Sequence, residues 1–144
     1  MKLKDSKEIL SSVLKTTQMG QVGIRSVLDT SMRPGLRKAL ESQLHEYDSI
    51  ETEAHSIATQ RGWELEELDP AVRFMTDMMT RMKLNGRNSD SKIAGMMIEG
   101  NTKGMIKGLK NLHQFAGQDE KINILSQKLL DCETANIRQM QSFL

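Results

Sequence analysis

The chain is poor in the residues that build β-sheets and disulfides. Its 144 residues include one tryptophan, one tyrosine, three phenylalanines, two prolines and one cysteine. A single cysteine excludes an intramolecular disulfide and suits a reducing compartment. No segment of useful length alternates apolar and polar residues or concentrates β-branched ones. We therefore predict an all-α protein without strands.

The chain also lacks an excess of charge of either sign and a long apolar run. Lysine and arginine number 20 against 19 aspartates and glutamates, which leaves a net charge of +1. Such a balance is not the electrostatic footprint of a nucleic-acid-binding protein. No apolar run approaches the roughly 20 residues of a membrane span, and no stretch has the pattern of a signal peptide. We expect a cytoplasmic protein that binds neither nucleic acid nor membranes.

Helix-start and helix-stop signals divide the chain into five segments. Asp5 followed by Glu8 has the pattern of a capping box, and Pro34 and Pro70 stand where first helical turns are expected. Gly62 suits the residue that ends a helix. Together with apolar residues at helical spacing, these signals predict one domain over residues 1–144, with helices at about 5–29, 33–61, 70–84, 90–115 and 119–143.

The connection between the second and the next long helix is unusually long. About 26 residues would be too many for a structureless loop, and this segment has a helix with its own caps at 70–84. Two antiparallel helix pairs joined by such a connection are a common way to close a four-helix bundle.

Over the whole chain, the helix number, the helix lengths and the 62–88 crossover resemble the ferritin-like superfamily. Within it, the chain is most similar to small, uncharacterised bacterial bundles of spore-coat or rubrerythrin-like type. The resemblance implies an all-α, ferritin-like four-helix bundle with a long helical crossover between the second and third long helices.

Glycines and methionines are concentrated in two neighbouring predicted helices. Each glycine inside a helix costs about 1 kcal/mol relative to alanine, so three at spacings of four need a compensating reason. The chain has eleven methionines, and those of the crossover helix form a stripe at helical spacing. We expect this stripe to pack in the glycine groove; the alternative is that the glycine face is a subunit interface in a homodimer. The residues concerned are Gly100, Gly104 and Gly108 on one side and Met75, Met78, Met79 and Met82 on the other.

Each long helix carries a polar residue near mid-length on or beside its apolar face. The resemblance implies metal ligands there, because ferritin-like di-iron and di-manganese proteins use two glutamates and two Glu-x-x-His pairs. In this chain Asn136 stands where a histidine would follow Glu133, and Ala54 stands where one would follow Glu51. The missing histidines favour a hydrogen-bonded polar layer of Gln21, Tyr47, Asn101 and Asn136 over an iron or manganese site on Glu51 and Glu133.

No catalytic motif stands out in the sequence. We find no Ser/His/Asp set, no phosphate-cradling loop, no zinc-ligand spacing and no nucleotide fingerprint. We therefore predict a non-catalytic helical bundle without a cofactor, acting through self-association or partner binding. The alternatives are a degenerate ferritin-like metal-binding protein that uses mid-bundle carboxylates, and a protein that binds an apolar small molecule between the crossover and the bundle.

Overall fold

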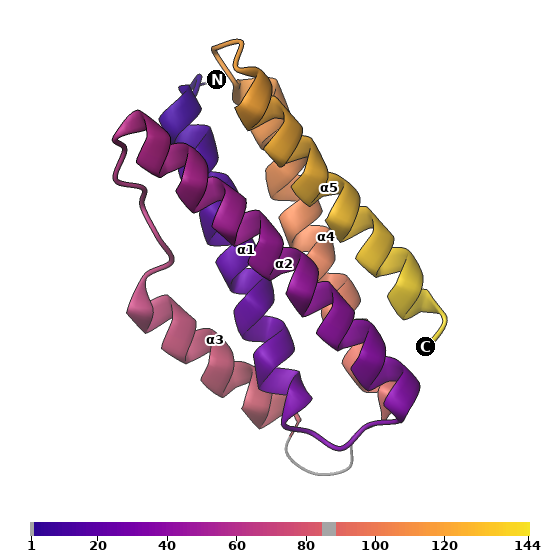
Figure 1. Cartoon of the computed structure of the whole chain (residues 1–144). Helices are drawn as coiled ribbons and strands as arrows, with labels where there is room; N and C mark the ends of the chain where they lie inside the picture. Colours follow the sequence, from indigo (N-terminus) through magenta and orange to yellow (C-terminus); the bar gives the residue numbers. More distant parts are fainter. Residues whose placement is uncertain (1, 85–88) are drawn as a thin grey trace.

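The computed structural model describes residues 2–84 and 89–144 of the chain. Within these ranges the protein is all-α, with five helices and no strand (Figure 1). Every helix begins and ends within two residues of the position that the sequence predicts. The helices are α1 (Ser6–Leu28), α2 (Pro34–Arg61), α3 (Pro70–Lys83), α4 (Asp90–Gln114) and α5 (Glu120–Gln141).

Local hydrogen bonds explain these boundaries. The Glu8 backbone amide donates to the Asp5 carboxylate over 2.8 Å, and the Glu8 carboxylate accepts from the Asp5 amide. The Asp69 side chain caps α3, whose first turn contains Pro70, and Gly62 ends α2 with a left-handed φ of 67°. These contacts satisfy backbone groups that helix ends otherwise leave without a partner.

The long helices pack as two hairpins. α1 lies against α2 and α4 lies against α5, while α1 also contacts α4 and α2 contacts α5 (Figure 1). The helices α2 and α4 run in the same direction in this view, and α3 lies outside them along α1. Among residues 2–84 and 89–144, no helix combines the length and the apolar character that a bilayer span requires.

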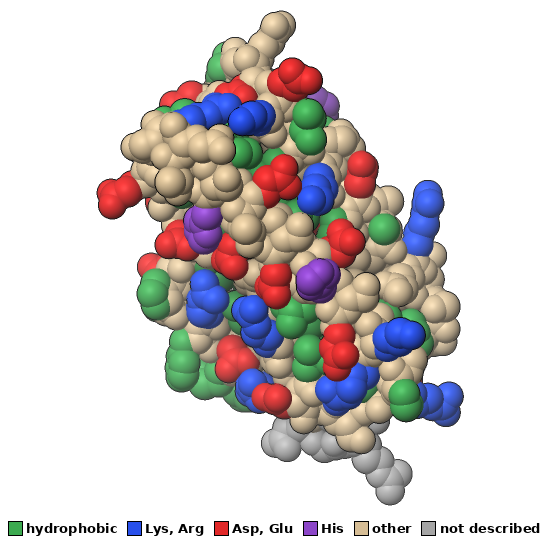
Figure 2. Space-filling view, viewed as in Figure 1, with side chains coloured by type: hydrophobic (Ala, Val, Ile, Leu, Met, Phe, Trp, Pro, Cys, Tyr) green, Lys and Arg blue, Asp and Glu red, His purple; other side chains and the backbone are tan. Residues whose placement is uncertain are grey.

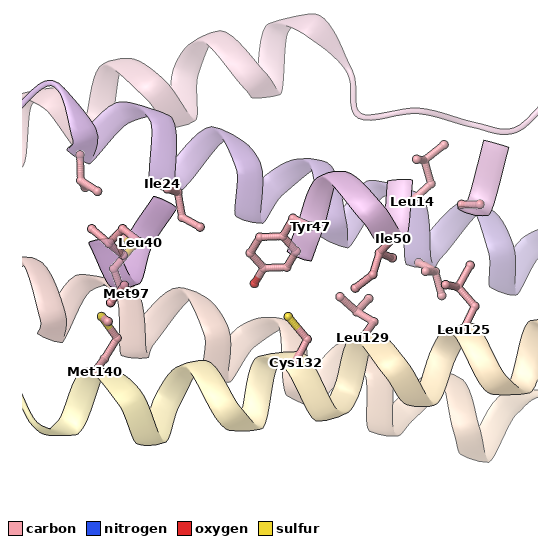
Figure 3. Packing of buried hydrophobic residues seen from close by; sticks show 14 of the residues in the cluster. Leu14, Ile24, Leu40, Tyr47, Ile50, Met97, Leu125, Leu129, Cys132 and Met140 are labelled. Carbon is pink, nitrogen blue, oxygen red and sulfur yellow. The ribbon is translucent and has the colours of Figure 1, made fainter. Parts of the chain in front are cut away.

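The four long helices share one buried apolar core (Figure 3). Tyr47 of α2 is 2 % exposed and directs its hydroxyl toward α4 and α5 (Figure 3). Each long helix contributes from the apolar face that its sequence predicts. Residues at the centre of the core include Leu14, Ile24, Leu40, Ile50, Met97, Leu125, Leu129 and Met140.

Helix α3 does not take part in the core, since none of its residues is buried. Polar contacts join it to the α1 region. The carboxylate of Asp77 is hydrogen-bonded to the buried Ser26 hydroxyl of α1. Arg81 forms an ion pair with Asp29, which follows α1, over 2.6 Å. Large apolar side chains of α3 lie on the surface, at the lower left of Figure 2.

Three methionines of the stripe do not pack in the glycine groove as predicted. Met75, Met78 and Met82 are 55 %, 44 % and 67 % exposed. The physical reason is that α5 already occupies much of the glycine face of α4: a Cβ added at Gly104 would overlap Glu133, and one at Gly108 would touch Leu130 at 3.5 Å. Gly104 and Gly108 thus serve the contact between α4 and α5, and α3 lies against α1 instead.

Two glycines of α1 provide a matched test of the packing around Tyr47. A Cβ added at Gly20 would lie 2.6 Å from Cζ of Tyr47, whereas one added at Gly23 would meet nothing within 4 Å. We predict that Gly20→Ala lowers the free energy of unfolding by roughly 1–3 kcal/mol through overpacking. Gly23→Ala should raise it by about 0.4–1 kcal/mol, because alanine restricts the unfolded chain. Urea denaturation of both variants checks this, and equal stabilities would contradict the close contact between Gly20 and Tyr47.

Candidate ligand-binding site

A carboxyl group from α5 is buried between the helices. Glu133 is 2 % exposed, and its carboxyl group lies directly against Gly104 of α4, where any Cβ would overlap it. The sequence places a costly glycine in the middle of α4, and the structure shows what this glycine permits. Without a side chain at position 104, the Glu133 carboxyl group can lie against the α4 backbone.

Three of the four residues predicted for the polar layer meet beside Glu133. The Tyr47 hydroxyl donates to Oδ1 of Asn101 over 2.9 Å, and Nδ2 of Asn136 donates to the same oxygen over 3.2 Å. Nδ2 of Asn101 donates to the backbone carbonyl of Met97 over 2.8 Å. This network joins α2, α4 and α5 through groups that would be costly to bury without partners.

The fourth residue of the predicted layer belongs to a separate network between α1 and α2. Nε2 of Gln21 donates to Asp48 over 2.9 Å and to Glu51 over 3.2 Å, and Gln18 also donates to Glu51. The Glu51 carboxylate is therefore occupied by amides of α1. Glu133 interacts with Tyr47 instead.

The two glutamates proposed as metal ligands therefore do not share a site. Tyr47, Ile50 and Ala54 of α2 face the core. Glu51 follows Ile50 by one residue, so its side chain points toward α1 instead. In the described part of the chain, no three or more His, Cys, Asp or Glu side chains gather in a group that could hold a metal ion.

Burial controls the protonation of the groups around Tyr47. Desolvation raises the pKa of Glu133 to about 8, and the nearby Tyr47 hydroxyl acts in the opposite direction. Glu133 is therefore mainly a neutral carboxylic acid at pH 7, able to donate a hydrogen bond as well as accept one. Burial also raises the pKa of Cys132 to about 12, so this thiol is not activated as a nucleophile.

A cavity of about 520 Å³ opens beside these groups, between α1, α3 and α4. We call it the interhelical cavity. Tyr47 and Glu133 are the lining residues that α2 and α5 contribute. Much of its wall is apolar, and four of its lining residues are glycines, of which Gly23 and Gly100 leave open space. The apolar residues are Met19, Ile24, Leu68, Met79, Met96 and Met97, and the glycines are Gly20, Gly23, Gly100 and Gly104.

The charged residues that line the interhelical cavity are mostly basic. They are Lys15, Lys83, Lys103 and Lys107, with Glu99 as the acidic residue besides Glu133. Because Glu133 is mainly protonated at pH 7, the ionised groups carry an excess of positive charge.

Sequence reasoning identified part of this site. It singled out Gly100, Gly104 and the methionines of α3, and one of these methionines, Met79, does line the interhelical cavity. It missed the opposite wall, formed by Gly20 and Gly23 of α1. Two glycines inside a predicted helix were the available signal, since the same cost argument that applied to α4 applies to them.

Comparison with known proteins adds no assignment. No protein-family model, curated protein sequence or solved structure matches the chain. The function must therefore be inferred from the geometry of the site.

The buried acid predicts a specific pH dependence of stability. The pKa of Glu133 is about 8 in the folded protein against 4.5 for an unperturbed glutamate, so the folded state binds more protons between these values. Stability should therefore fall as pH rises through this window, with a slope from this group of up to about 1.4 kcal/mol per pH unit. Glu133→Gln should remove that slope, and Glu99→Gln, at an exposed position of α4, should retain it. Urea denaturation at a series of pH values checks this; identical slopes for the wild type and Glu133→Gln would contradict it.

Proposed function

We propose that the protein is a non-catalytic helical bundle that binds an apolar small molecule in the interhelical cavity. The observation that carries this proposal is a cavity of about 520 Å³ with largely apolar walls and three buried polar residues, Tyr47, Asn101 and Glu133. Ligand sites typically have about 300–1,000 Å³, apolar linings and a few polar groups that orient the ligand. Methionine side chains also adapt their shape to the bound molecule.

The arrangement of the long helices supports a ferritin-like architecture as part of this proposal. The two hairpins would form the four-helix bundle, and α3 would be the helical crossover between them. Within such a bundle, the site would not use the metal-binding pattern of the superfamily. Glu51 is engaged by Gln18 and Gln21, whereas Glu133 lies beside Tyr47 and Gly104.

Filling the interhelical cavity tests the proposal directly. Gly23 and Gly100 line it from α1 and α4, and a Cβ at either position would meet nothing within 4 Å. We predict that the folded wild type binds the neutral apolar fluorophore N-phenyl-1-naphthylamine. Gly23→Leu and Gly100→Leu together should weaken this binding by about tenfold or more, because leucine side chains occupy the volume.

The control is Gly95→Leu, which makes the same substitution in α4 at a position that does not line the interhelical cavity and has nothing within 4 Å. Circular dichroism and urea denaturation confirm that each variant is folded. Equal affinity of the double variant and the control, or no binding by the wild type, would overturn the proposal.

Self-association is a second candidate function, favoured by the exposed apolar side chains of α3. Phe74, Met75 and Met82 are 65 %, 55 % and 67 % exposed, and Met78 and Met79 lie among them. A concentration of large exposed apolar side chains often marks an interaction surface. A second copy of the chain could cover this side of α3 without disturbing the core.

Light scattering coupled to size-exclusion chromatography tests this second function. We expect a homodimer at micromolar concentration that Met78→Glu and Met82→Glu convert to a monomer, because a buried charge without a partner is costly. Ile124→Glu, at a 56 % exposed position of α5, is the matched control and should remain dimeric. A wild type that is monomeric at every concentration would exclude self-association.

A further inference from the structure

A second cavity lies next to the interhelical cavity and differs from it in character. It has a volume of about 470 Å³, and we call it the polar pocket. Four lysines and three glutamates contribute to its lining. Lys15, Thr16 and Lys107 line both cavities, so a largely apolar space and a charged one meet at these residues.

The polar pocket brings two ammonium groups together. The chain near Lys4 is held beside the end of α4: its amide donates to the carbonyl of Gln114 over 2.7 Å, and its carbonyl accepts from Ala116 over 2.8 Å. Nζ of Lys4 donates to Oδ1 of Asn111 over 3.1 Å. Lys107 lines the same pocket. Burial and the positive charge of Lys107 both lower the pKa of Lys4.

The acidic residues of the polar pocket offset this charge only in part. Lys15 is paired with Glu66 over 3.1 Å, and Glu8 raises the pKa of Lys4 but does not outweigh the lowering effects. Lys107 makes no ion pair with any residue that the structure describes. With four lysines against three glutamates, the lining keeps an excess of positive charge. A bound anion would relieve the repulsion between Lys4 and Lys107.

We infer that the bound molecule is an amphipathic anion with a single apolar chain, an inference that rests on the proposed function. Its carboxylate or phosphate lies between Lys4 and Lys107, and its chain extends past Lys15 and Thr16 into the interhelical cavity. The lysines at the junction disfavour a cationic ligand, and the uncharged Glu133 does not repel an apolar chain. An amphipathic anion thus matches both the charged and the apolar part of the combined site.

The test compares ligands that share one chain and differ in the head group. Dodecanoate, dodecyl phosphate, dodecanol and dodecylammonium, each below its micelle concentration, compete with N-phenyl-1-naphthylamine for the wild-type protein. We expect the two anions to bind about fivefold or more tightly than the alcohol, and the ammonium compound to bind most weakly. The carboxylate and the phosphate serve as separate arms that distinguish the two head groups.

Variants of the lysines show whether the head group lies where we infer. Lys107→Gln should weaken dodecanoate binding by about two- to fivefold and leave dodecanol unchanged, while Lys107→Arg should retain the preference for the anion. Lys110→Gln removes a charge from an exposed position of α4 outside both cavities and is the control.

The outcomes separate this inference from the proposed function. If the fluorophore binds but anion and alcohol compete equally, or if dodecylammonium binds best, the inference is overturned and the proposed function stands. An anion preference that Lys107→Gln leaves unchanged also overturns it. If neither the fluorophore nor any dodecyl compound binds, the proposed function itself fails.

Discussion

The arrangement of this protein depends on burying the Glu133 carboxyl group, which has no cationic partner among the residues that the structure describes. Transferring a charged carboxylate into the interior is costly, and the group responds by holding its proton at neutral pH. The neutral acid lies against the backbone at Gly104 and beside the Tyr47 hydroxyl, which is itself bonded to Asn101. Helices α2, α4 and α5 are therefore joined at mid-length by groups whose positions are mutually dependent.

The same close contacts explain why space remains between α1 and α4. Gly20 and Gly104 admit the Tyr47 ring and the Glu133 carboxyl group, while Gly23 and Gly100 contribute no side chains to the neighbouring volume. Helix α3 borders this space without filling it. Its polar contacts join Asp77 to Ser26 of α1 and Arg81 to Asp29, which follows α1. The glycines thus have two roles, close packing on one side and an open cavity on the other.

A binding function fits these features better than a metal centre does. Metal sites of the ferritin-like kind need several carboxylates and histidines around one metal position. Here Glu51 and Glu133 belong to separate networks. The interhelical cavity instead offers apolar walls and an uncharged acid, with lysines where it meets the polar pocket. In the proposed function, these properties would select a ligand by shape, apolar surface and charge rather than by coordination.

The sequence by itself determined the helices and their ends. The signals were local: the Asp5 and Glu8 capping box, Asp69 before Pro70, and the left-handed position at Gly62. It also indicated which face of each long helix is buried, because apolar spacing follows the helical period. Tyr47, Asn101 and Asn136 could be assigned to a polar layer for the same reason.

Only the tertiary structure decided which faces meet. Glu51 lies one residue away from the core-facing line of α2, so it hydrogen-bonds with Gln21 of α1 and does not reach the polar layer. The partner of Gly104 and Gly108 proved to be α5 rather than α3. Lys4 and Lys107, far apart in the sequence, line one pocket. The physical reason is that helical periodicity defines the direction of a side chain about its own axis, whereas the neighbour that it meets depends on how the helices pack.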